Sequence, residues 1–505
     1  MDETNRPILI GAAQLSEREL TLENAPTPLE MLERIAREAA ESAGGDASLL
    51  ASIDTIGLTS IMGWSPTNGP RLLAEQIGAR PSVEWVSPNG GETPVALLSR
   101  AAEAIVAGKS QLALLAGCNN FRTIGLARKA GVRLDWPAGG SGTPTSTGKE
   151  SPGSNDLEAS VGLSLPISIY PIFENGLRHA RGQTLEEHRR AMGALFHPFT
   201  RVAASNPHAW FPIERSAEEL VTPTADNRMI GFPYTKYLNA IMATDQAAGV
   251  LVASEAMARR LGVPEADWIH WRGGAFAAED PWFASERPSF SEAPAIRTCH
   301  QTALANAGLE LDEIDLFDFY SCFPVAVAMA CEMLDLAQDD PRGLTLTGGL
   351  PYAGGPGNSY SLHSLATAVD ALRAGRGRHA LVTGNGWYLT KHSAAVLSRE
   401  PGPTAHVPSA AAPTTATRAS WQAPPVHLAK EADGAARVET YTIMHDREGA
   451  PEQGIVIARL EDSDARFLAN TPPDRALLES LETSELIGTR GSARSESGKI
   501  IFHPG

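Results

Sequence analysis

Cysteine is scarce in this chain, since only four of its 505 residues are cysteines and they stand far apart. They form no Cys-x-x-Cys pair of the kind that holds zinc, and they are too few for the disulfide framework of a small secreted domain. We therefore expect no metal site. A reducing cytoplasm is the simplest compartment for a chain with this cysteine usage.

Basic clusters and long apolar runs are also missing. The formal net charge is −17, and no run of Lys and Arg offers a face for phosphates, which argues against a nucleic-acid partner. No apolar stretch approaches about 18 residues, so we predict no membrane span. The first residues, MDETNRPILIGAAQL, place acids before their apolar run, the wrong polarity for a signal peptide. By elimination, a large cytoplasmic enzyme is the expected class.

What the sequence does contain is an alternation of strand and helix patterns near its start. Short apolar runs predict strands at 7–13, 53–59, 83–87 and 111–117, and amphipathic patterns predict helices at 27–43 and 92–107. Thr27, Pro28 and Glu30 form the signature of a capped helix start. This rhythm is typical of a layered α/β fold with a buried sheet.

Two regions break the rhythm. Residues 119–230 hold a stretch rich in Gly, Ser, Thr and Pro (138–155) and then polar helical segments, which indicates an insertion that covers a ligand site. Residues 401–425 are rich in Pro, Ala and Thr, which is typical of a linker. Beyond them, 436–505 alternate in period 2 around a short helix, which predicts a small OB-like β-barrel.

An internal repeat is the most informative pattern. Residues 94–117 align without a gap on 361–384 at an offset of 267, with Gly108 matching Gly375 and Gly117 matching Gly384. Chance similarity between Ala- and Leu-rich helices is the alternative, but the order, the spacing and the following strand all agree. Two copies of a βαβαβ unit would place a ligand site between the halves, at strand ends and helix starts.

The second copy carries motifs that resemble a known family. IDLFDFYSCFPVAVAMACEML (314–334), LTGGLPYAGGPGNSY (346–360), LVTGNGWYLT (381–390) and the segment 227–255 are similar, in this order, to elements of the thiolase superfamily, and especially of sterol-carrier-type thiolase-like proteins. The resemblance covers roughly residues 6–400. It implies duplicated halves in a layered α/β/α/β/α core with an inserted loop domain.

The domain boundaries follow from the repeat and the resemblance. We predict a first half (1–120, completed by 240–275), an inserted loop domain (121–239), a second half (276–400), a linker (401–425) and the OB-like barrel (426–505).

The chain departs from the family at its chemical positions. The family's nucleophilic Cys falls on Asn89, Gly90 or Gly91, of which Gly90 fits best, and the activating His falls on Gly355. The second catalytic Cys falls near residues 383–385, and Tyr320 replaces the His before the second-half helix. Since a thiolate is needed for ping-pong acyl transfer, the usual family reaction lacks its nucleophile.

Tyr320 is the main catalytic candidate because a phenol there would act as acid or base on a hydroxyl or enolate oxygen. Lipid-transfer-type aldolases in the superfamily resemble this arrangement. Tyr352 and Tyr360 are further phenols near the Gly-rich turn, and Asn385 is a candidate for bonding a thioester or water. For each, a packed or turn residue is the competing interpretation. We expect Cys322 to be structural.

Several further residues are ligand-binding candidates. Backbone N–H groups at Gly90, Gly91, Gly355 and Gly357 would form an oxyanion hole for the thioester, although simple turn geometry explains Gly90 and Gly91 equally well. By resemblance the insertion covers coenzyme A, which makes four residues candidates for binding it, with surface solvation as the default: Lys149, Arg201, His208 and Lys236.

The leading functional hypothesis is an acyl-CoA enzyme of aldolase or retro-aldolase type that acts on a C–C bond next to a thioester. An acetyl-CoA acetyltransferase and a non-catalytic acyl-CoA or lipid-binding protein are the alternatives. We expect no permanently bound cofactor, coenzyme A only as part of the substrate, and a possible homodimer through the core.

Overall fold

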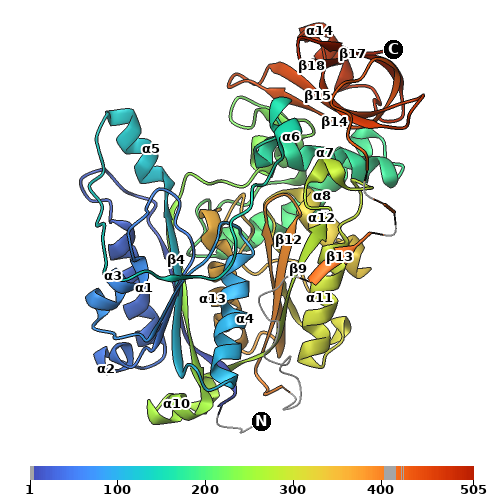
Figure 1. Ribbon diagram of the computed structural model, residues 1–505. Helices are drawn as coiled ribbons and strands as arrows, with labels where there is room; N and C mark the ends of the chain where they lie inside the picture. Colours follow the sequence, from blue (N-terminus) through green and yellow to red (C-terminus); the bar gives the residue numbers. More distant parts are fainter. Residues whose placement is uncertain (1–4, 403–416, 422, 425) are drawn as a thin grey trace.

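The computed structural model describes residues 5–402, 417–421, 423–424 and 426–505, and most of the predicted linker lies outside them (Figure 1). An 11-stranded sheet forms the core, and a 7-stranded sheet joins the five strands of the C-terminal part, drawn in red above the core, to two short strands of the insertion. The confirmed fold class is a duplicated α/β core with an insertion and a closed C-terminal barrel.

The first half is a mixed five-stranded segment of the large sheet, in the order β1-β8-β4-β2-β3. Parallel β2, β3 and β4 follow the predicted pattern, and β8 pairs antiparallel with both β1 and β4. The strands are β1 (Pro7–Ser16), β2 (Thr55–Leu58), β3 (Val83–Val86), β4 (Leu112–Asn120) and β8 (Asp245–Ser254). The helices are α1 (Pro28–Ser42), α2 (Ala47–Ala51), α3 (Gly69–Ile77), α4 (Thr93–Val106) and α10 (Glu255–Arg260).

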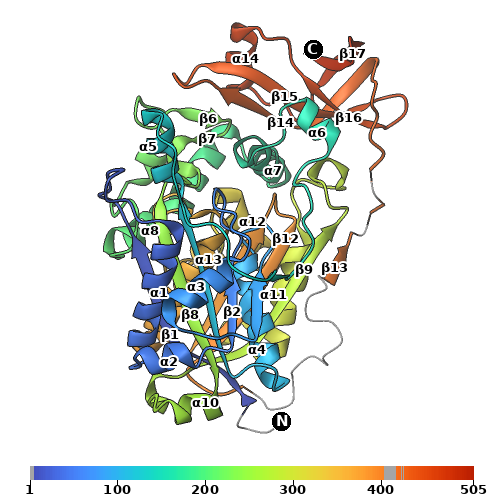
Figure 2. The same ribbon diagram turned by 60° about the vertical axis from the view of Figure 1, so that its left-hand side comes forward.

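The second half repeats this plan with β10-β11-β12-β9. Its strands are β9 (Ile269–Asp280), β10 (Leu316–Asp318), β11 (His379–Gly386) and β12 (Lys391–Ser398), and its helices are α11 (Pro294–Ala307), α12 (Pro324–Leu334) and α13 (Tyr360–Arg373). The two half-sheets meet where Ile8 and Leu9 pair with Ile269 and His270. Helices α4 and α13 lie between the halves (Figures 1 and 2).

The two copies use the same device to hold their strands. At the offset of 267, the ends of α4 coincide with those of α13. The Asp54 carboxylate accepts from the Gln111 amide at 2.7 Å, and the Asp315 carboxylate accepts from the equivalent Arg378 amide, also at 2.7 Å. The duplication expected from the sequence is therefore present in the packing as well as in the order of elements.

The insertion packs mainly as helices, with three very short strands. Its elements are α5 (Phe121–Ala130), β5 (Thr145–Ser146), α6 (Asp156–Ser160), α7 (Pro166–Ala180), α8 (Leu185–Ser205), α9 (Ala217–Val221), β6 (Met229–Gly231) and β7 (Tyr234–Thr235). The stretch expected to be a loop contains β5, which pairs with the outer edge of β3. An open strand edge invites pairing with another chain, and β5 covers part of this one.

The C-terminal barrel closes on itself because β14 pairs with both β15 and β17 in the ring β15-β16-β18-β17-β14. Its elements are β14 (Gly434–His445), β15 (Pro451–Leu460), β16 (Arg466–Asn470), α14 (Arg475–Leu481), β17 (Arg490–Glu496) and β18 (Lys499–Pro504). The sequence pattern did not identify β17, which is largely exposed and polar. The assignment of the whole barrel to the OB type remains a prediction.

The barrel is docked firmly on the insertion. Buried Arg178 of α7 forms a double hydrogen bond with Glu485, at 2.5 and 2.8 Å. The Thr440 hydroxyl of β14 donates to the Ile172 carbonyl of α7 at 2.6 Å. The described part of the predicted linker also holds a strand that was not foreseen, β13 (Thr417–Ser420), which runs parallel to β9.

Candidate functional site

The turns expected to carry chemistry converge at the N-terminal end of α4, where the two halves meet. The Gly90 amide donates to the Asn358 side-chain oxygen at 2.9 Å. The Asn358 side-chain nitrogen donates to the Ser60 carbonyl at 2.8 Å and to the Asn89 side chain at 3.1 Å. Asn358, which the sequence analysis did not single out, thus ties the two halves together at this point.

Tyr320 follows β10 and reaches this junction. Its amide donates to the Thr383 hydroxyl at 2.9 Å, and its ring meets the ring of Tyr360 edge-on at 5.5 Å between centroids. The ring is half-buried, and its hydroxyl forms no hydrogen bond with any described residue. Loss of water around the hydroxyl raises the pKa of Tyr320 well above its ordinary value, so the phenol is protonated at neutral pH.

Asn385 lies at the end of β11 and is buried. Its side-chain nitrogen donates to the hydroxyl of Tyr170 at 2.9 Å, and the Tyr170 hydroxyl donates to the Trp387 carbonyl at 2.9 Å. The side-chain oxygen of Asn385 has no partner among the described residues. Tyr170 belongs to α7, so a helix of the insertion reaches directly to the predicted Asn385 position.

The glycines around Glu92 and the Tyr320 hydroxyl are explained by close internal packing. A Cβ at Gly90 would lie 2.0 Å from a Glu92 carboxylate oxygen, and φ is +148° there. A Cβ at Gly91 would lie 2.3 Å from the Tyr320 hydroxyl. A Cβ at Gly386 would lie 1.8 Å from Glu92. No larger residue, a cysteine included, fits at these positions unless the surroundings move.

The ion pair between Glu92 and Lys391 is a feature that the sequence analysis missed. Their side chains meet at 2.6 Å and are almost wholly buried, and Lys391 also donates to the Asn89 carbonyl at 2.7 Å. Burial raises the pKa of the Glu92 carboxyl, although Lys391 opposes the shift. A lone lysine within the apolar β12 pattern was the available signal, because lysine is rarely buried without a partner.

The four cysteines offer no thiolate. All are buried and free, and burial raises the pKa of both the Cys322 and the Cys331 thiol to about 12. It raises the pKa values of Cys118 and Cys299 as well. Since the thiolate is the nucleophilic form, none of these side chains is set up for acyl transfer at neutral pH.

Three of the four proposed oxyanion-hole amides, those of Gly90, Gly355 and Gly357, already have acceptors. Besides the Gly90 amide, the Gly355 amide donates to the Ile241 carbonyl at 2.8 Å. Gly357 donates to the Gly355 carbonyl at 2.7 Å, in a tight turn with positive φ. Tyr352 is fully buried, with its ring edge-on to Phe196 and its hydroxyl unpaired among the described residues. The amides of Gly90, Gly355 and Gly357 are therefore not free donors in this conformation.

The four coenzyme A candidates have different surroundings. Exposed Arg201 lies 3.7 Å from Glu214, and exposed Lys236 donates to the Asp226 carbonyl at 3.1 Å. His208 lines a very small hollow of about 10 Å³ with His363, and burial lowers the pKa of His208. Of the four, only Lys149 lines the large cavity described next.

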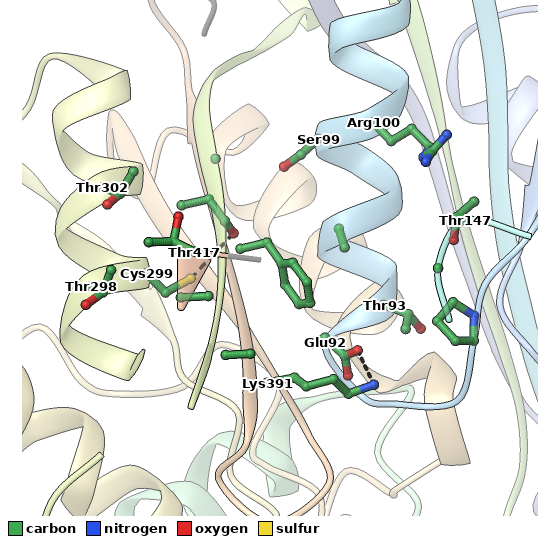
Figure 3. Close-up of a pocket in the computed structure, with 18 of the residues that line it drawn as sticks. Glu92, Thr93, Ser99, Arg100, Thr147, Thr298, Cys299, Thr302, Lys391 and Thr417 are labelled. Atoms are coloured by element: carbon green, nitrogen blue, oxygen red, sulfur yellow. Dashed lines mark hydrogen bonds and ion pairs between the residues drawn. The ribbon is translucent and has the colours of Figure 1, made fainter. Parts of the chain in front are cut away.

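A cavity of about 500 Å³ starts at the Glu92–Lys391 pair and runs along α4 (Figure 3). Strand β9 and helix α11 of the second half form its far side, and the 147–151 loop borders it. Tyr320 is not among its lining residues. The volume falls within the range typical of small-molecule sites.

The described residues contain no cluster of three or more His, Cys, Asp or Glu side chains arranged to hold a metal ion. Within the same residues, no helix combines the length and apolar character needed to cross a membrane.

Comparison with known proteins gives matches to both parts of the chain. Residues 419–497 match the family described as "Thiolase-like protein type 1 additional C-terminal domain". A stretch of 143 residues is 27% identical to the benzoylsuccinyl-CoA thiolase subunit BbsB of Thauera aromatica. That match spans 28% of this chain and 34% of the relative, about a third of its length.

Similar solved structures extend the likeness to the whole chain. The Ltp2-ChsH2(DUF35) aldolase (18% identity, TM-score 0.60) covers 78% of this chain and 98% of its own. An acetyl-CoA acetyltransferase from Syntrophomonas wolfei (15% identity, TM-score 0.56) covers 79% of this chain and all of its own. At such identities, both show the fold alone.

The third structure is a monomeric SCP2-thiolase like protein type 1 from Mycobacterium smegmatis, with 34% identity and a TM-score of 0.84. The alignment covers all of both chains. Because that protein is monomeric, it does not support the homodimer expected from the wider resemblance. Identity at this level over the full length shows that the chain belongs to the family of SCP2-thiolase-like proteins of type 1.

Proposed function

We propose that this protein acts on the carbon–carbon bond next to an acyl-CoA thioester, as an aldolase-type enzyme without a cysteine nucleophile. The observation that carries the proposal is the Tyr320 hydroxyl, which stands unpaired beside the start of α4. The neighbouring phenols of Tyr170 and Tyr360 are already hydrogen-bonded, to Trp387 and Thr347 respectively. The Ltp2-ChsH2(DUF35) aldolase has a similar fold, so the proposed reaction class occurs among proteins of this fold.

The raised pKa of Tyr320 keeps its phenol protonated, which makes it a proton donor in the free protein. A protonated phenol donates to the alkoxide that forms when a thioester enolate adds to a carbonyl. By microscopic reversibility, the same residue takes the proton from a β-hydroxyl in the reverse, cleaving step. We therefore assign Tyr320 the role of proton donor to the product oxygen. Asn385 is proposed to orient the substrate through its unpaired side-chain oxygen.

The experiment compares Tyr320→Phe with the unchanged protein on a panel of β-hydroxyacyl-CoA thioesters and their cleavage products, followed by mass spectrometry. Loss of the acid should lower the rate on the order of 100-fold or more. Tyr237→Phe is the matched control, since Tyr237 is also half-buried but packs under Arg215. Full activity in Tyr320→Phe would overturn the proposal.

A non-catalytic thioester-binding protein is the second candidate, and the engaged Gly90 and Gly355 amides favour it. Coenzyme A binding measured by calorimetry, without turnover of any thioester in the panel, would establish this function instead. The acetyl-CoA acetyltransferase alternative has no nucleophile to support it among the described residues. An acyl-enzyme trapped after treatment with acetyl-CoA would support that alternative.

A further inference from the structure

The large cavity along α4 is separate from the Tyr320 junction and has a character of its own. Its two long walls come from the two halves of the core, α4 on one side and α11 with β9 on the other (Figure 3). At its lower end in this view, Lys391 neutralises Glu92. The rest of the lining decides what kind of molecule it would accept.

Ser99 of α4 presents an unsatisfied hydroxyl to this cavity. The side chain is 8% exposed, points toward the space between the helices and has no hydrogen-bond partner among the described residues (Figure 3). A buried polar group without a partner is unfavourable, and a ligand that hydrogen-bonds to it relieves that cost. On the facing wall, α11 contributes the hydroxyls of Thr298 and Thr302, one turn apart. The middle of the cavity therefore favours a ligand with hydroxyl or amide groups.

The charges of the lining favour an anion. Three cations and two acids line the cavity, and the Glu92–Lys391 pair removes one of each. Neither Arg100 nor Lys149 lies within ion-pairing distance of an acid among the described residues, although Glu103 partly offsets Arg100 from the next turn of α4. The Arg100 guanidinium packs over the Trp85 ring, 5.4 Å from its centroid.

The geometry of α4 connects the hydroxyl groups around Ser99 with the cations Arg100 and Lys149 in one continuous cavity. At about 100° per residue, Ala96 lies between Ser99 and Arg100 around the helix. Because the Ala96 side chain is only a methyl group, it leaves room for a ligand to cross this face of α4. Ala275 and Phe276 of β9 add apolar surface on the opposite wall. Figure 3 shows Arg100 and Thr147 on one side of α4, with Ser99 on the other.

We propose that this cavity is a second ligand site, which binds a small elongated organic anion. Its carboxylate meets Arg100 and Lys149, and its hydroxyl- or amide-bearing stem crosses Ala96 to reach Ser99 and the α11 threonines. The site does not depend on the proposed reaction at Tyr320.

The test uses two probes of nearly equal shape, pantothenate and its uncharged alcohol panthenol, titrated in the full chain by calorimetry and ligand-observed NMR. Pantothenate should bind, and panthenol should bind at least about tenfold more weakly, since a charge-assisted hydrogen bond is worth roughly 1.4 kcal/mol or more. Arg100→Gln should weaken pantothenate by about tenfold and leave panthenol unchanged. Ser99→Ala should weaken both probes a few-fold. Lys109→Gln, just beyond the C-terminal end of α4, is the matched control.

Equal affinity for both probes, no detectable binding of pantothenate at millimolar concentration, or an unaltered affinity in Arg100→Gln would each overturn the proposal. If Arg100→Gln does not fold, Lys149→Gln replaces it, because Lys149 is exposed and its loss should still weaken pantothenate a few-fold. Tyr320→Phe separates the two proposals, since it should retain full pantothenate affinity whatever becomes of turnover.

Discussion

The two halves of the core agree in how they hold their strands and differ in how their inner helices begin. Asp54 and Asp315 perform the same task in both copies. At the helix starts, buried Glu92 pairs with Lys391, whereas the equivalent Ser359 shares a hydrogen bond with Thr59 at 3.0 Å. The duplicated framework has thus kept its backbone supports, while the surfaces that meet at the centre have diverged into a charged and a neutral version.

The largest predicted effect follows from breaking the Glu92–Lys391 ion pair at the start of α4. Lys391→Met leaves the Glu92 carboxylate buried without its partner, which should lower the free energy of unfolding by about 3–5 kcal/mol at pH 8. Because burial raises the pKa of Glu92, the carboxyl is neutral at low pH and the loss should shrink as the pH falls. Urea unfolding at pH 8 and pH 5 measures both effects, with Lys109→Met as the control. An equal loss at both pH values would contradict this account.

A smaller effect tests the shared supports. Asp54→Ala should cost about 2–3 kcal/mol and Asp315→Ala about 1–2 kcal/mol, since each change leaves backbone amides without an acceptor. Asp54 loses more because it also accepts from the Ser110 hydroxyl at 2.6 Å. Denaturant midpoints of the two variants provide the comparison. A costlier Asp315→Ala would mean that the supports are not equivalent.

The smallest effect compares Glu103 of α4 with its counterpart Asp370 of α13. Burial raises the pKa of Glu103 to about 7 and raises the pKa of Asp370. A raised folded-state pKa means that stability is lost as the pH rises from about 4.5 through 7. Glu103→Gln should therefore stabilise the fold by about 1–2 kcal/mol at pH 8, after allowing for partial exposure, and change nothing at pH 4. Thermal unfolding across pH checks this, and Asp370→Asn should shift in the same direction.

Local signals in the sequence predicted local structure well. Thr27 caps α1 as expected. Its hydroxyl accepts from the Glu30 amide at 3.2 Å, and the Glu30 carboxylate accepts from the Thr27 amide at 2.7 Å. Such a motif needs only four consecutive residues. The repeat likewise predicted the equivalence of α4 and α13, because it preserves spacing over a whole helix and strand.

Features that depend on distant partners were not predictable in the same way. Strand β17 has little apolar pattern and is defined by its pairing with β14 and β18. Strand β13 forms on the edge of β9 in a stretch whose composition indicates a linker. At the site, the sequence predicted that Gly90 and Tyr320 belong together. It did not reveal that Glu92 and Lys391, almost 300 residues apart in the chain, form a buried ion pair.

The docking of the barrel on α7 has a consequence for how the junction is built. Tyr170, which holds Asn385, lies on the same helix that receives β14, so the C-terminal barrel supports a residue that reaches into the core. Since both bodies belong to one chain, their effective concentration is fixed by the covalent connection. Dilution therefore cannot separate the barrel from the helix it braces, and the complete junction is available at any protein concentration.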